Sequence, residues 1–524
     1  MFLSSVNQYK KQGYLLLDEA VVATASDCRL QFFQAAKDPA SPMITATEKW
    51  EGCGPYTWSS RMLYLPEQEK YRLYYTSFQD KGNHYRTGAV ESADGLNWTK
   101  PALFQQQYEG ETVNYCMQTK GYEEEFNICK PARSVTYDPR PDCPPKKRFK
   151  AMSFSYQGNN VFYSADGYTW ECDPGNPVWH GTSDIIHCIW DDRLQKFVLY
   201  YKLWKLYALE KDDAAPNGCR TVEAYYTTFH TEEQPDGWTK FTGPRVYFQP
   251  GSASIVKKES ILIRSGDLST DDGGGGHLIG AWHTKRVVCR SESDDFVHWE
   301  LDQEVLNVDE RDRPDANIQI AQVFTMGGYY LAFLTMHDQR GFFDVQLAFS
   351  NDGIAWKRPW RGNLISHGAP AQFDHGMATT PADPIITETQ MLLYYGGSTG
   401  DHTELRTTFA IGRAILRRDG FACRRADGEP VGQLTTVPLP RKQDALYLNA
   451  DAEGGWLTAA LLDEQGNPIP GYTHENCAII RDDSASHPDC FTKISWNGQT
   501  ALPLQTHFRV DLRFQNASIY SILI

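Results

Sequence analysis

The chain has 524 residues, a formal net charge of −15 and an isoelectric point near 5.4. This acidity argues against binding to nucleic acid or to anionic membrane surfaces. The length favours one large domain with a smaller one beside it. Aromatic residues make up 13% of the chain, with 28 Tyr and 14 Trp. Such a content suits β-sheets, and it also suits a protein whose rings stack on sugars.

Residues 1–10 contain no basic stretch followed by an apolar run, so we expect no signal peptide. No run of about 18 apolar residues occurs, so we expect no transmembrane helix. The twelve cysteines include no Cys-x-x-Cys pair, which argues against a zinc knuckle or a redox motif. Without a signal peptide, these scattered cysteines also argue against a disulfide scaffold. We therefore expect a cytoplasmic protein, and we leave a homo-oligomer open.

Short β-like runs begin the chain between residues 14 and 46, among them Tyr14-Leu-Leu-Leu17 and Leu30-Gln-Phe-Phe33. A closed ring of sheets commonly uses one N-terminal strand to complete its last sheet, because this removes a free edge. We expect one strand of this segment to have that role.

A repeated pattern then occurs five times: a β run, an acidic or glycine turn, and a second run rich in Tyr, Leu and Phe. Each pattern predicts the first two strands of one sheet. The five patterns begin at Tyr56, Ala132, Asp184, Asn317 and Gly376.

A second repeat alternates with the first and has the form Ser-x-Asp-Gly-x-x-Trp. In this phrase Asp-Gly predicts a tight turn and Trp an anchoring ring, which we expect to pack on the preceding sheet. Because two separate patterns agree in number and order, we predict a five-bladed β-propeller. The copies begin at Ser92, Ser164, Ser293 and Ser350, and a degenerate fifth copy begins at Arg418.

The third blade is too long for a four-stranded unit. Residues 205–281 include Asp271-Asp-Gly-Gly-Gly-Gly276 and a separate Asp236-Gly237-Trp238. No opening pattern precedes Trp238, so we interpret about 205–281 as an insertion in the third blade, with a sixth blade as the alternative. After Gly428 the chain consists of alternating strands and turns. We predict a propeller over 1–428 and a C-terminal β-sandwich over 429–524.

The chain resembles a family of uncharacterised bacterial proteins described as family-32-like. The matching motifs include Phe373-Asp374-x-Gly376-Met377 and Tyr394-Tyr-Gly-Gly397 followed by His402. The resemblance implies the five-bladed fold of glycoside hydrolase families 32, 43, 62 and 68 and a carbohydrate substrate. The Trp-x-Asn-Asp-Pro-Asn-Gly, Arg-Asp-Pro and Glu-Cys motifs of family 32 proper are absent. The other matches are Asp309-Glu310-x-Asp312, Asp419-Gly420-Phe421, Leu448-Asn449 and Pro470-Gly471.

Glycoside hydrolysis requires two carboxylates, one protonated and one ionised, on either side of the scissile bond. Inner strands of a propeller converge on a central funnel, so acids just before these strands are the candidates. We predict that the catalytic pair is drawn from Glu51, Asp184, Glu310 and Asp374. For each of them a solvated loop residue or a turn cap is the alternative.

Substrate-binding candidates lie at the same strand openings. Arg133 can bind a hydroxyl or an anion. Three histidines can bind hydroxyls or surround a structural cation in the funnel, although a lone histidine is more often structural. We expect no other cofactor and no zinc site. The candidates are Arg133, His187, His375 and His402, with Tyr56, Trp58 and Tyr395 as stacking platforms.

The leading hypothesis is a glycoside hydrolase acting on small oligosaccharides or glycosides. A glycoside phosphorylase is the second hypothesis, because Arg133 stands at a strand opening. A carbohydrate-binding propeller without activity is the third. Sugar identity, linkage and stereochemistry stay open at this point.

Overall fold

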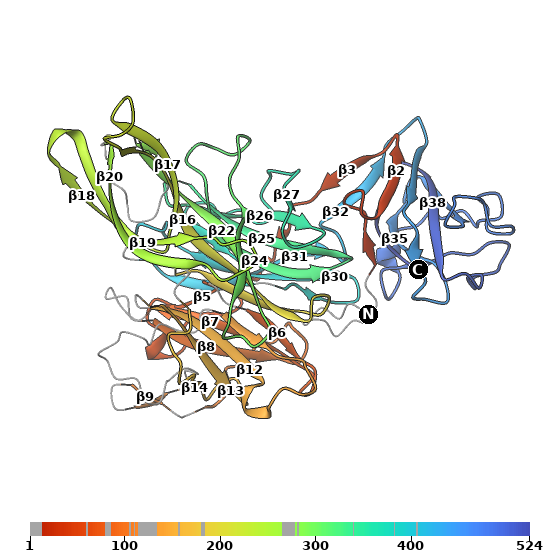
Figure 1. The fold of residues 1–524 in the computed structure, drawn as a ribbon. Helices are drawn as coiled ribbons and strands as arrows, with labels where there is room; N and C mark the ends of the chain where they lie inside the picture. The colour runs from red at the N-terminus through yellow and green to blue at the C-terminus, as the bar shows by residue number, and fades with distance from the viewer. Residues whose placement is uncertain are drawn as a thin grey trace.

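A computed structural model describes residues 13–58, 61–78, 85–103, 106–108, 111–113, 134–155, 158–179, 184–264, 278–279, 282–338, 340–381, 383–404 and 407–524. The described chain is built of β-strands, with short 3-10 segments such as η1 (Lys49–Glu51), η3 (Pro145–Lys147), η4 (Pro235–Gly237) and η5 (Ser484–Ser486) between them. Figure 1 shows a large body of sheets with a smaller sheet region beside it. None of the described helices is long and apolar enough to cross a bilayer.

The large body contains antiparallel meanders, which we number as first to fifth in chain order. In the first and fifth of them, two short strands together form the first strand, and both pair with the same long second strand. The first has β5 (Pro55–Tyr56), β6 (Met62–Leu65), β7 (Lys70–Phe78) and β8 (Tyr85–Ser92), and the second has β11 (Ser134–Tyr137), β12 (Phe149–Ser155), β13 (Gly158–Ser164) and β14 (Glu171–Cys172). The third has β15 (Ile186–Asp191), β16 (Lys196–Lys211), β22 (Trp282–Ser293) and β23 (Glu300–Leu306).

The fourth and fifth meanders are joined by a single bridge between Phe343 and Met377. The fourth has β24 (Asn317–Met326), β25 (Tyr329–His337), β26 (Phe343–Ser350) and β27 (Trp356–Lys357). The fifth has β28 (Met377–Thr379), β29 (Ile385–Ile386), β30 (Gln390–Ser398), β31 (Phe409–Arg417) and the N-terminal β4 (Ala36–Lys37). Here β4 pairs with β31, so an N-terminal strand completes the last meander.

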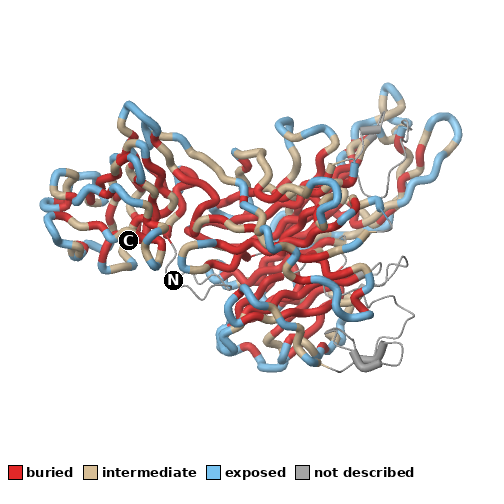
Figure 2. Tube along the Cα trace, turned by 180° about the vertical axis from the view of Figure 1, so that it is seen from behind, coloured by how far each residue is buried: buried red, intermediate tan, exposed pale blue. Residues whose placement is uncertain are grey.

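Shared apolar cores connect neighbouring meanders. One cluster of buried side chains joins the first to the second, and others join the second to the third and the third to the fourth. Two further clusters join the fourth to the fifth and the fifth back to the first. The contacts therefore run in circular order. Figure 2 shows the buried residues running through the sheets, with exposed residues at the loops.

The insertion of the third meander extends its own sheet. Strands β16 and β22 stay paired from Phe197 and Ser293 to Ala208 and Trp282. Beyond them lie β17 (Cys219–Tyr226), β18 (His230–Gln234), β19 (Trp238–Tyr247), β20 (Ile255–Arg264) and β21 (Leu278–Ile279), which all belong to the same sheet. Figure 1 shows β17 to β20 as long hairpins that project at the upper left. A separate hairpin is formed by β9 (Gln106–Tyr108) and β10 (Glu111–Val113).

The Ser-x-Asp phrase folds into the same hydrogen-bonded turn in its first four copies. In the first copy, the backbone N–H of Gly95 donates to Ser92 Oγ at 2.8 Å, and those of Leu96 and Asn97 donate to Asp94 Oδ1 at 2.8 Å. The turn needs a positive φ at its fourth position, which Gly95 adopts at 71°. Phe296 occupies this position in the third copy with φ 72°, a conformation that is strained for a large side chain. The sequence prediction of a tight turn thus agrees with the hydrogen bonding.

Tyrosines from the preceding meander bind three of these turns. Tyr394 of the fifth meander donates its hydroxyl proton to Gly95 O at 2.6 Å, which closes the contact from last to first. Tyr74 donates to Gly167 O at 3.0 Å, and Tyr200 donates to Gly353 O at 3.1 Å. Each bond joins a meander to the turn of the next one.

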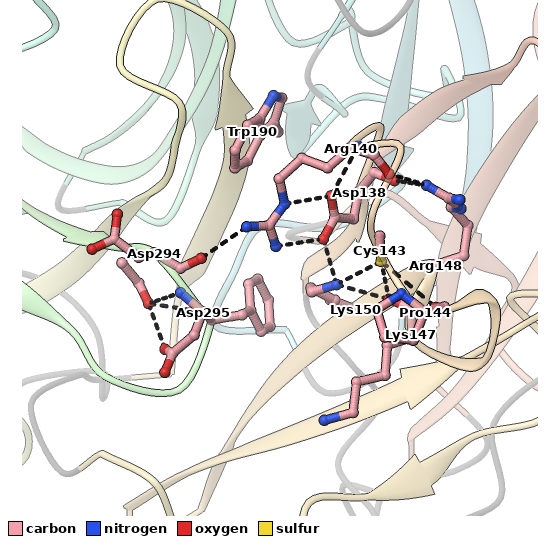
Figure 3. Close-up of polar contacts among 12 residues, drawn as sticks. Asp138, Arg140, Cys143, Pro144, Lys147, Arg148, Lys150, Trp190, Asp294 and Asp295 are labelled. Carbon is pink, nitrogen blue, oxygen red and sulfur yellow. Dashed lines mark hydrogen bonds and ion pairs between the residues drawn. The ribbon is translucent and has the colours of Figure 1, made fainter.

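An arginine takes the place of tyrosine between the second and third meanders (Figure 3). Arg140 donates to Asp294 O at 3.1 Å, and its guanidinium lies over the Trp190 ring at 4.9 Å. The buried Asp138 holds this guanidinium through bonds of 2.9 and 2.7 Å and also accepts from Lys150 at 2.7 Å. These ion pairs and hydrogen bonds hold the pKa of Asp138 well below its usual range, against the effect of burial.

The anchoring tryptophans Trp98 and Trp356 contact a tyrosine of the neighbouring meander and also belong to apolar clusters that include their own sheet. Trp98 meets the Tyr394 ring edge-on at 5.1 Å, and Trp356 meets the Tyr200 ring at 6.0 Å. The tryptophans therefore lie where two neighbouring sheets meet, and the contact with the second of these sheets was not expected from the sequence. The reason is that the turn hydrogen bonds already draw these tyrosines to the same place.

The degenerate fifth copy joins the fifth meander to the C-terminal region. Phe421 packs against Phe333 and Phe324 of the fourth meander at 6.0 and 6.4 Å. The buried Asp419 accepts from Ser521 Oγ at 2.5 Å, and Asn449 donates to Arg418 O at 2.8 Å. This turn thus ties both a neighbouring meander and the last strand to the fifth meander.

Two sheets form the smaller region, and N-terminal strands belong to both of them. One has β3 (Arg29–Phe32), β32 (Ala422–Ala426), β39 (Ala517–Leu523), β35 (Tyr447–Asp451) and β37 (Thr492–Lys493), with β1 (Tyr14–Leu15) on β39. The other has β2 (Val22–Ser26), β33 (Gly432–Thr436), β38 (His507–Gln515), β34 (Leu439–Pro440) and β36 (Trp456–Leu462). Their buried residues share one apolar cluster. Figure 1 shows β2 and β3 beside β32, β35 and β38.

We predict that Tyr200→Phe lowers the free energy of unfolding by about 1 kcal/mol, because one buried hydrogen bond to Gly353 O is lost. Urea denaturation measures this change. The control is Tyr64→Phe, because the Tyr64 hydroxyl has no hydrogen-bond partner in the described part of the chain. An equal decrease in the free energy of unfolding for both variants would show that the hydrogen bond between Tyr200 and Gly353 does not stabilise the fold.

We also predict that the protein loses stability as the pH falls from about 4 to about 2. Hydrogen bonds from backbone and side chain lower the pKa of Asp295 to about 2, although burial opposes the shift, and similar bonds lower the pKa of Asp166 and Asp352. An unfolded aspartate titrates near about 3.9. The stabilisation is therefore fully present above that pH and is lost as the pH falls through the folded value. Urea midpoints across this range test the prediction, and a flat profile contradicts it.

Candidate active site

Side chains from several meanders meet around His402, and we call this group the His402 cluster. It consists of Trp58, Asp184, Lys202, Arg286, His337 and His402. Trp58 follows β5, Asp184 precedes β15, Lys202 and Arg286 lie on β16 and β22, and His337 ends β25. The cluster thus collects residues from the first, third, fourth and fifth meanders.

Asp184 forms an ion pair within the cluster. Its carboxylate lies 2.5 Å from Lys202 Nζ. The Asp184 side chain is 33% exposed, whereas that of Lys202 is 5% exposed. Solvent therefore reaches the carboxylate while its cationic partner is buried. Such a carboxylate is accessible to a ligand and is held in one orientation.

Arg286 is the second cation of the cluster. Its guanidinium donates to Nδ1 of His337, and it lies over the Trp204 ring at 4.9 Å. Its backbone N–H donates to Asn317 Oδ1 at 3.0 Å, and Asn317 is the first residue of β24. Because Lys202 Nζ lies 5.2 Å from the same Trp204 ring, one indole supports both cations. The fourth meander is thus bound to the third at this end.

His402 lies among rings and charged groups. Its ring is 5.3 Å from that of Trp58 and 5.5 Å from that of His337. Burial lowers the pKa of His402 to about 3, and the positive charges of Arg286 and Lys202 act in the same direction. The carboxylates of Asp184 and Asp401 oppose this shift. At neutral pH the imidazole is neutral, so it can donate one hydrogen bond and accept another.

An apolar wall lies beside the cluster. The buried residues Tyr56, Phe343 and Met377 pack together, with Trp58 and Phe409 against them. The predicted stacking residue Tyr56 is 0% exposed, and its hydroxyl lies 3.7 Å from Met377 Sδ. Trp58 is only half-buried and is the ring of this wall that also borders His402. A sugar ring can stack on an indole in such a position.

Two other predicted acids lie apart from the cluster. Glu51 is fully buried and accepts hydrogen bonds from Tyr75 at 2.6 Å, from Lys100 at 2.6 Å and from the backbone N–H groups of Thr47 and Glu48. Glu51 thereby fixes the loop before β5. Glu310 is exposed on the turn before β24.

Asp374 and Tyr395 line a different cavity. Asp374 is 1% exposed and accepts from Tyr395 Oη at 2.9 Å and from Lys37 Nζ at 2.5 Å. The cavity around them has a volume of about 380 Å³. His375 lies next to it, with Nδ1 3.3 Å from Gly368 O.

The remaining predicted binding residues are placed as follows. His187 is buried, and its Nε2–H donates to Val323 O at 2.8 Å, which joins the third and fourth meanders. Burial lowers its pKa to about 3. Arg133 lies outside the described residues. Of the predicted residues, Asp184, Trp58 and His402 thus come together in one place.

Sequence reasoning missed Lys202, Arg286, His337 and Asp401. It considered acids before first strands, whereas Lys202 and Arg286 lie inside β16 and β22 and His337 ends β25. One signal was present: Lys202 directly follows the apolar run Phe197-Val-Leu-Tyr-Tyr201, where a charge is unexpected. His337 likewise ends an apolar strand.

Asp383 was also missed, and it lies deep among the first strands. It is 5% exposed and accepts from Arg61 Nε at 3.3 Å. Arg61 also donates to Cys188 O of β15. Burial raises the pKa of Asp383 to about 6, and Arg61 only partly offsets this effect. Asp383 lies between β28 and β29 rather than before a first strand, so the search for acids did not reach it.

No group of three or more metal-ligating side chains lies close enough to hold an ion, as far as the described ranges extend. The predicted structural cation therefore stays a prediction.

Comparisons by sequence found no matching family model and no matching curated protein. Solved structures with some similarity include a glycosyl hydrolase from Bacteroides ovatus, with 10% identity over 77% of this chain and 96% of that chain and a TM-score of 0.37. Another is the β-1,2-mannobiose phosphorylase from Listeria innocua, with 8% identity over 74% and 97% and a TM-score of 0.29. A third is an exo-β-1,3-galactanase from Phanerochaete chrysosporium, with 8% identity over 95% and 100% and a TM-score of 0.28. The similarity to each of these three structures is low.

Proposed function

We propose that the protein is a glycoside-processing enzyme whose active site is the His402 cluster. The observation that carries this proposal is the accessible Asp184 carboxylate, fixed 2.5 Å from Lys202 beside the neutral imidazole of His402 and the half-buried ring of Trp58. A sugar ring is bound by aromatic faces together with fixed hydrogen-bond donors and acceptors.

The proposed fold is a five-bladed β-propeller with a C-terminal β-sandwich. The circular order of the shared clusters supports the propeller, and the single core of the two smaller sheets supports the sandwich. The boundary near residue 428 stays part of the proposal, although β32 and residues 14–32 pair with the C-terminal sheets. In a propeller, the His402 cluster lies at the end where first strands begin.

In the proposed hydrolase, Asp184 is one of the two required carboxylates. Asp401 is the second candidate, because it precedes His402 and acts electrostatically on its imidazole. Asp401 Oδ1 accepts from Thr403 N at 2.7 Å and from Thr403 Oγ1 at 2.6 Å, which fixes its orientation. Trp58 would stack on the sugar, and His402 would bind a hydroxyl. Small oligosaccharides are the proposed substrates.

A glycoside phosphorylase is the second candidate, and the two buried cations favour it. In phosphorolysis, inorganic phosphate takes the place of water as the attacking group. The site therefore needs cations that bind the phosphate. Lys202 and Arg286 are 5% and 1% exposed and lie on the same side as Asp184. A binding protein without turnover is the remaining alternative.

We predict that Asp184→Asn lowers turnover of the best nitrophenyl glycoside at least about a hundredfold, because a carboxylate that transfers a proton contributes about 10²–10⁴. Release of nitrophenol from a panel of glycosides measures this effect. The matched control is Asp192→Asn, which changes a carboxylate at the opposite end of β15. Turnover that persists in Asp184→Asn would contradict the assignment.

The two enzyme candidates differ in their need for phosphate. We expect a hydrolase to release free sugar at the same rate with and without inorganic phosphate. A phosphorylase would form a sugar phosphate only when phosphate is present, and Lys202→Met would raise its KM for phosphate. Chromatography of the products distinguishes the two. Binding without either product would leave only the non-catalytic alternative.

A further inference from the structure

The cavity at Asp374 is lined by groups that suit a ligand, although it shares none of the side chains that form the His402 cluster. Its volume is about 380 Å³, and its lining includes Lys37, Pro39, Gln372, Phe373, Asp374 and Tyr395. A cavity of this size lies within the range of small-molecule sites. At its base Asp374 Oδ2 accepts from both Lys37 and Tyr395.

The same triad of side chains occurs in the first meander. There Glu51 accepts from Tyr75 and from Lys100, as Asp374 accepts from Tyr395 and from Lys37. In both meanders the acid follows an aromatic residue and precedes the first strand, and the tyrosine lies on the second strand. In both meanders the lysine, Lys37 or Lys100, comes from the outer edge of the sheet. The chain therefore contains two versions of one structural unit.

The first-meander version is closed. Glu51 is 0% exposed, and the backbone N–H groups of Thr47 and Glu48 donate to its carboxylate at 2.7 and 2.9 Å. Lys100 is bound by Thr47 Oγ1 at 2.6 Å as well as by Glu51. The ring of Trp50 stacks on Tyr75 with planes only 13° apart. Both oxygens of the Glu51 carboxylate are therefore already bound by the protein itself.

The fifth-meander version is open. The Lys37 side chain is 30% exposed, against 14% for that of Lys100. Phe373 lies tilted by 33° from the Tyr395 ring, at 5.9 Å, in place of a flat stack. Across the described residues, Asp374 Oδ1 accepts no hydrogen bond, whereas Oδ2 accepts two. The partly exposed Lys37 ammonium thus keeps donors for a further group in the cavity.

The charges around the cavity balance, which indicates the class of ligand. Lys37 neutralises Asp374, and the other lining carboxylate, Asp38, is paired with Arg413. No net charge remains to select an anion or a cation. Rings and prolines provide apolar faces, and hydroxyl, amide, ammonium and carboxylate groups provide donors and acceptors. This combination matches a neutral ring that carries hydroxyl groups.

We propose that this cavity is a second carbohydrate-binding site, which takes one neutral sugar residue and lies apart from the His402 cluster. Phe373 contacts the sugar ring and Lys37 binds its hydroxyls, while the buried Asp374 and Tyr395 hold Lys37 in place. Because β4 supplies Lys37, the N-terminal strand both completes the fifth meander and forms one side of this site. The site needs no turnover at Asp184, so the two proposals are tested separately.

Calorimetric titration of the full chain with the methyl glycosides of glucose, galactose, mannose and xylose tests this site. In Tyr395→Phe we expect the affinity for the best of them to fall about tenfold, because one hydrogen bond that holds Asp374 is lost. Lys37→Met removes an ammonium donor and should lower the affinity at least as far. Tyr75→Phe is the matched control, since it alters the closed triad in the same way and should leave the affinity unchanged.

Binding that survives in Asp184→Asn and falls in Tyr395→Phe supports the second site even if no glycoside is turned over. The proposal is overturned if none of the four glycosides binds, or if Tyr75→Phe and Tyr395→Phe lower affinity equally. It is also overturned if binding disappears in Asp184→Asn but is unchanged in Tyr395→Phe. Thermal unfolding of each variant shows whether it is folded. If Tyr395→Phe does not fold, the affinity of Lys37→Met is compared with that of Tyr75→Phe instead.

Discussion

The contact between a polar turn and a side chain of the preceding meander is the constraint on which the rest of the molecule depends. Each Ser-x-Asp turn satisfies its own backbone N–H groups with the aspartate and leaves one carbonyl directed outward. A tyrosine hydroxyl, or Arg140 in one place, donates to a carbonyl of this turn. Since buried polar groups are costly without partners, these bonds specify how neighbouring meanders align.

The two ends of the meanders therefore carry different kinds of side-chain contacts. The turns lie where third strands end, and their aspartates, the tyrosines that bind them and Arg140 form a hydrogen-bonded layer. Figure 3 shows the part of this layer around Asp138 and Arg140. The His402 cluster lies where first strands begin and second strands end. One end thus fixes the relative positions of the sheets, and the other is left to collect side chains from several of them. Loops on a rigid frame are a common place for binding and catalysis.

Much of the fold was predictable because each meander repeats local signals. The Asp-Gly turns, the Tyr-rich second strands and the five openings all correspond to observed strands and turns. The partners of the tryptophans were not predictable, because Trp98 and Tyr394 are almost 300 positions apart and meet only in the assembled fold. The pairing of β1 to β3 with C-terminal strands is long-range in the same way.

The candidate site was predictable only in part. Asp184 was selected from its place before a strand and His402 from a motif, and both lie in the proposed site. The rule that selected Asp184 also selected Glu51, which is fully buried by its own partners. Lys202 and Arg286 were missed because charged residues inside long strands carry no local signal of the cluster that they join. The repeat of an acid, tyrosine and lysine became visible only through its hydrogen bonds.

The most direct test of the account is a crystal structure of Asp184→Asn with a bound disaccharide glycoside. The account predicts that a sugar ring stacks on Trp58 and that the side chain at position 184 lies within hydrogen-bond distance of the glycosidic oxygen or the anomeric carbon's substituents. A disaccharide bound with its glycosidic bond away from Trp58, His402 and position 184 would contradict the assignment of the active site.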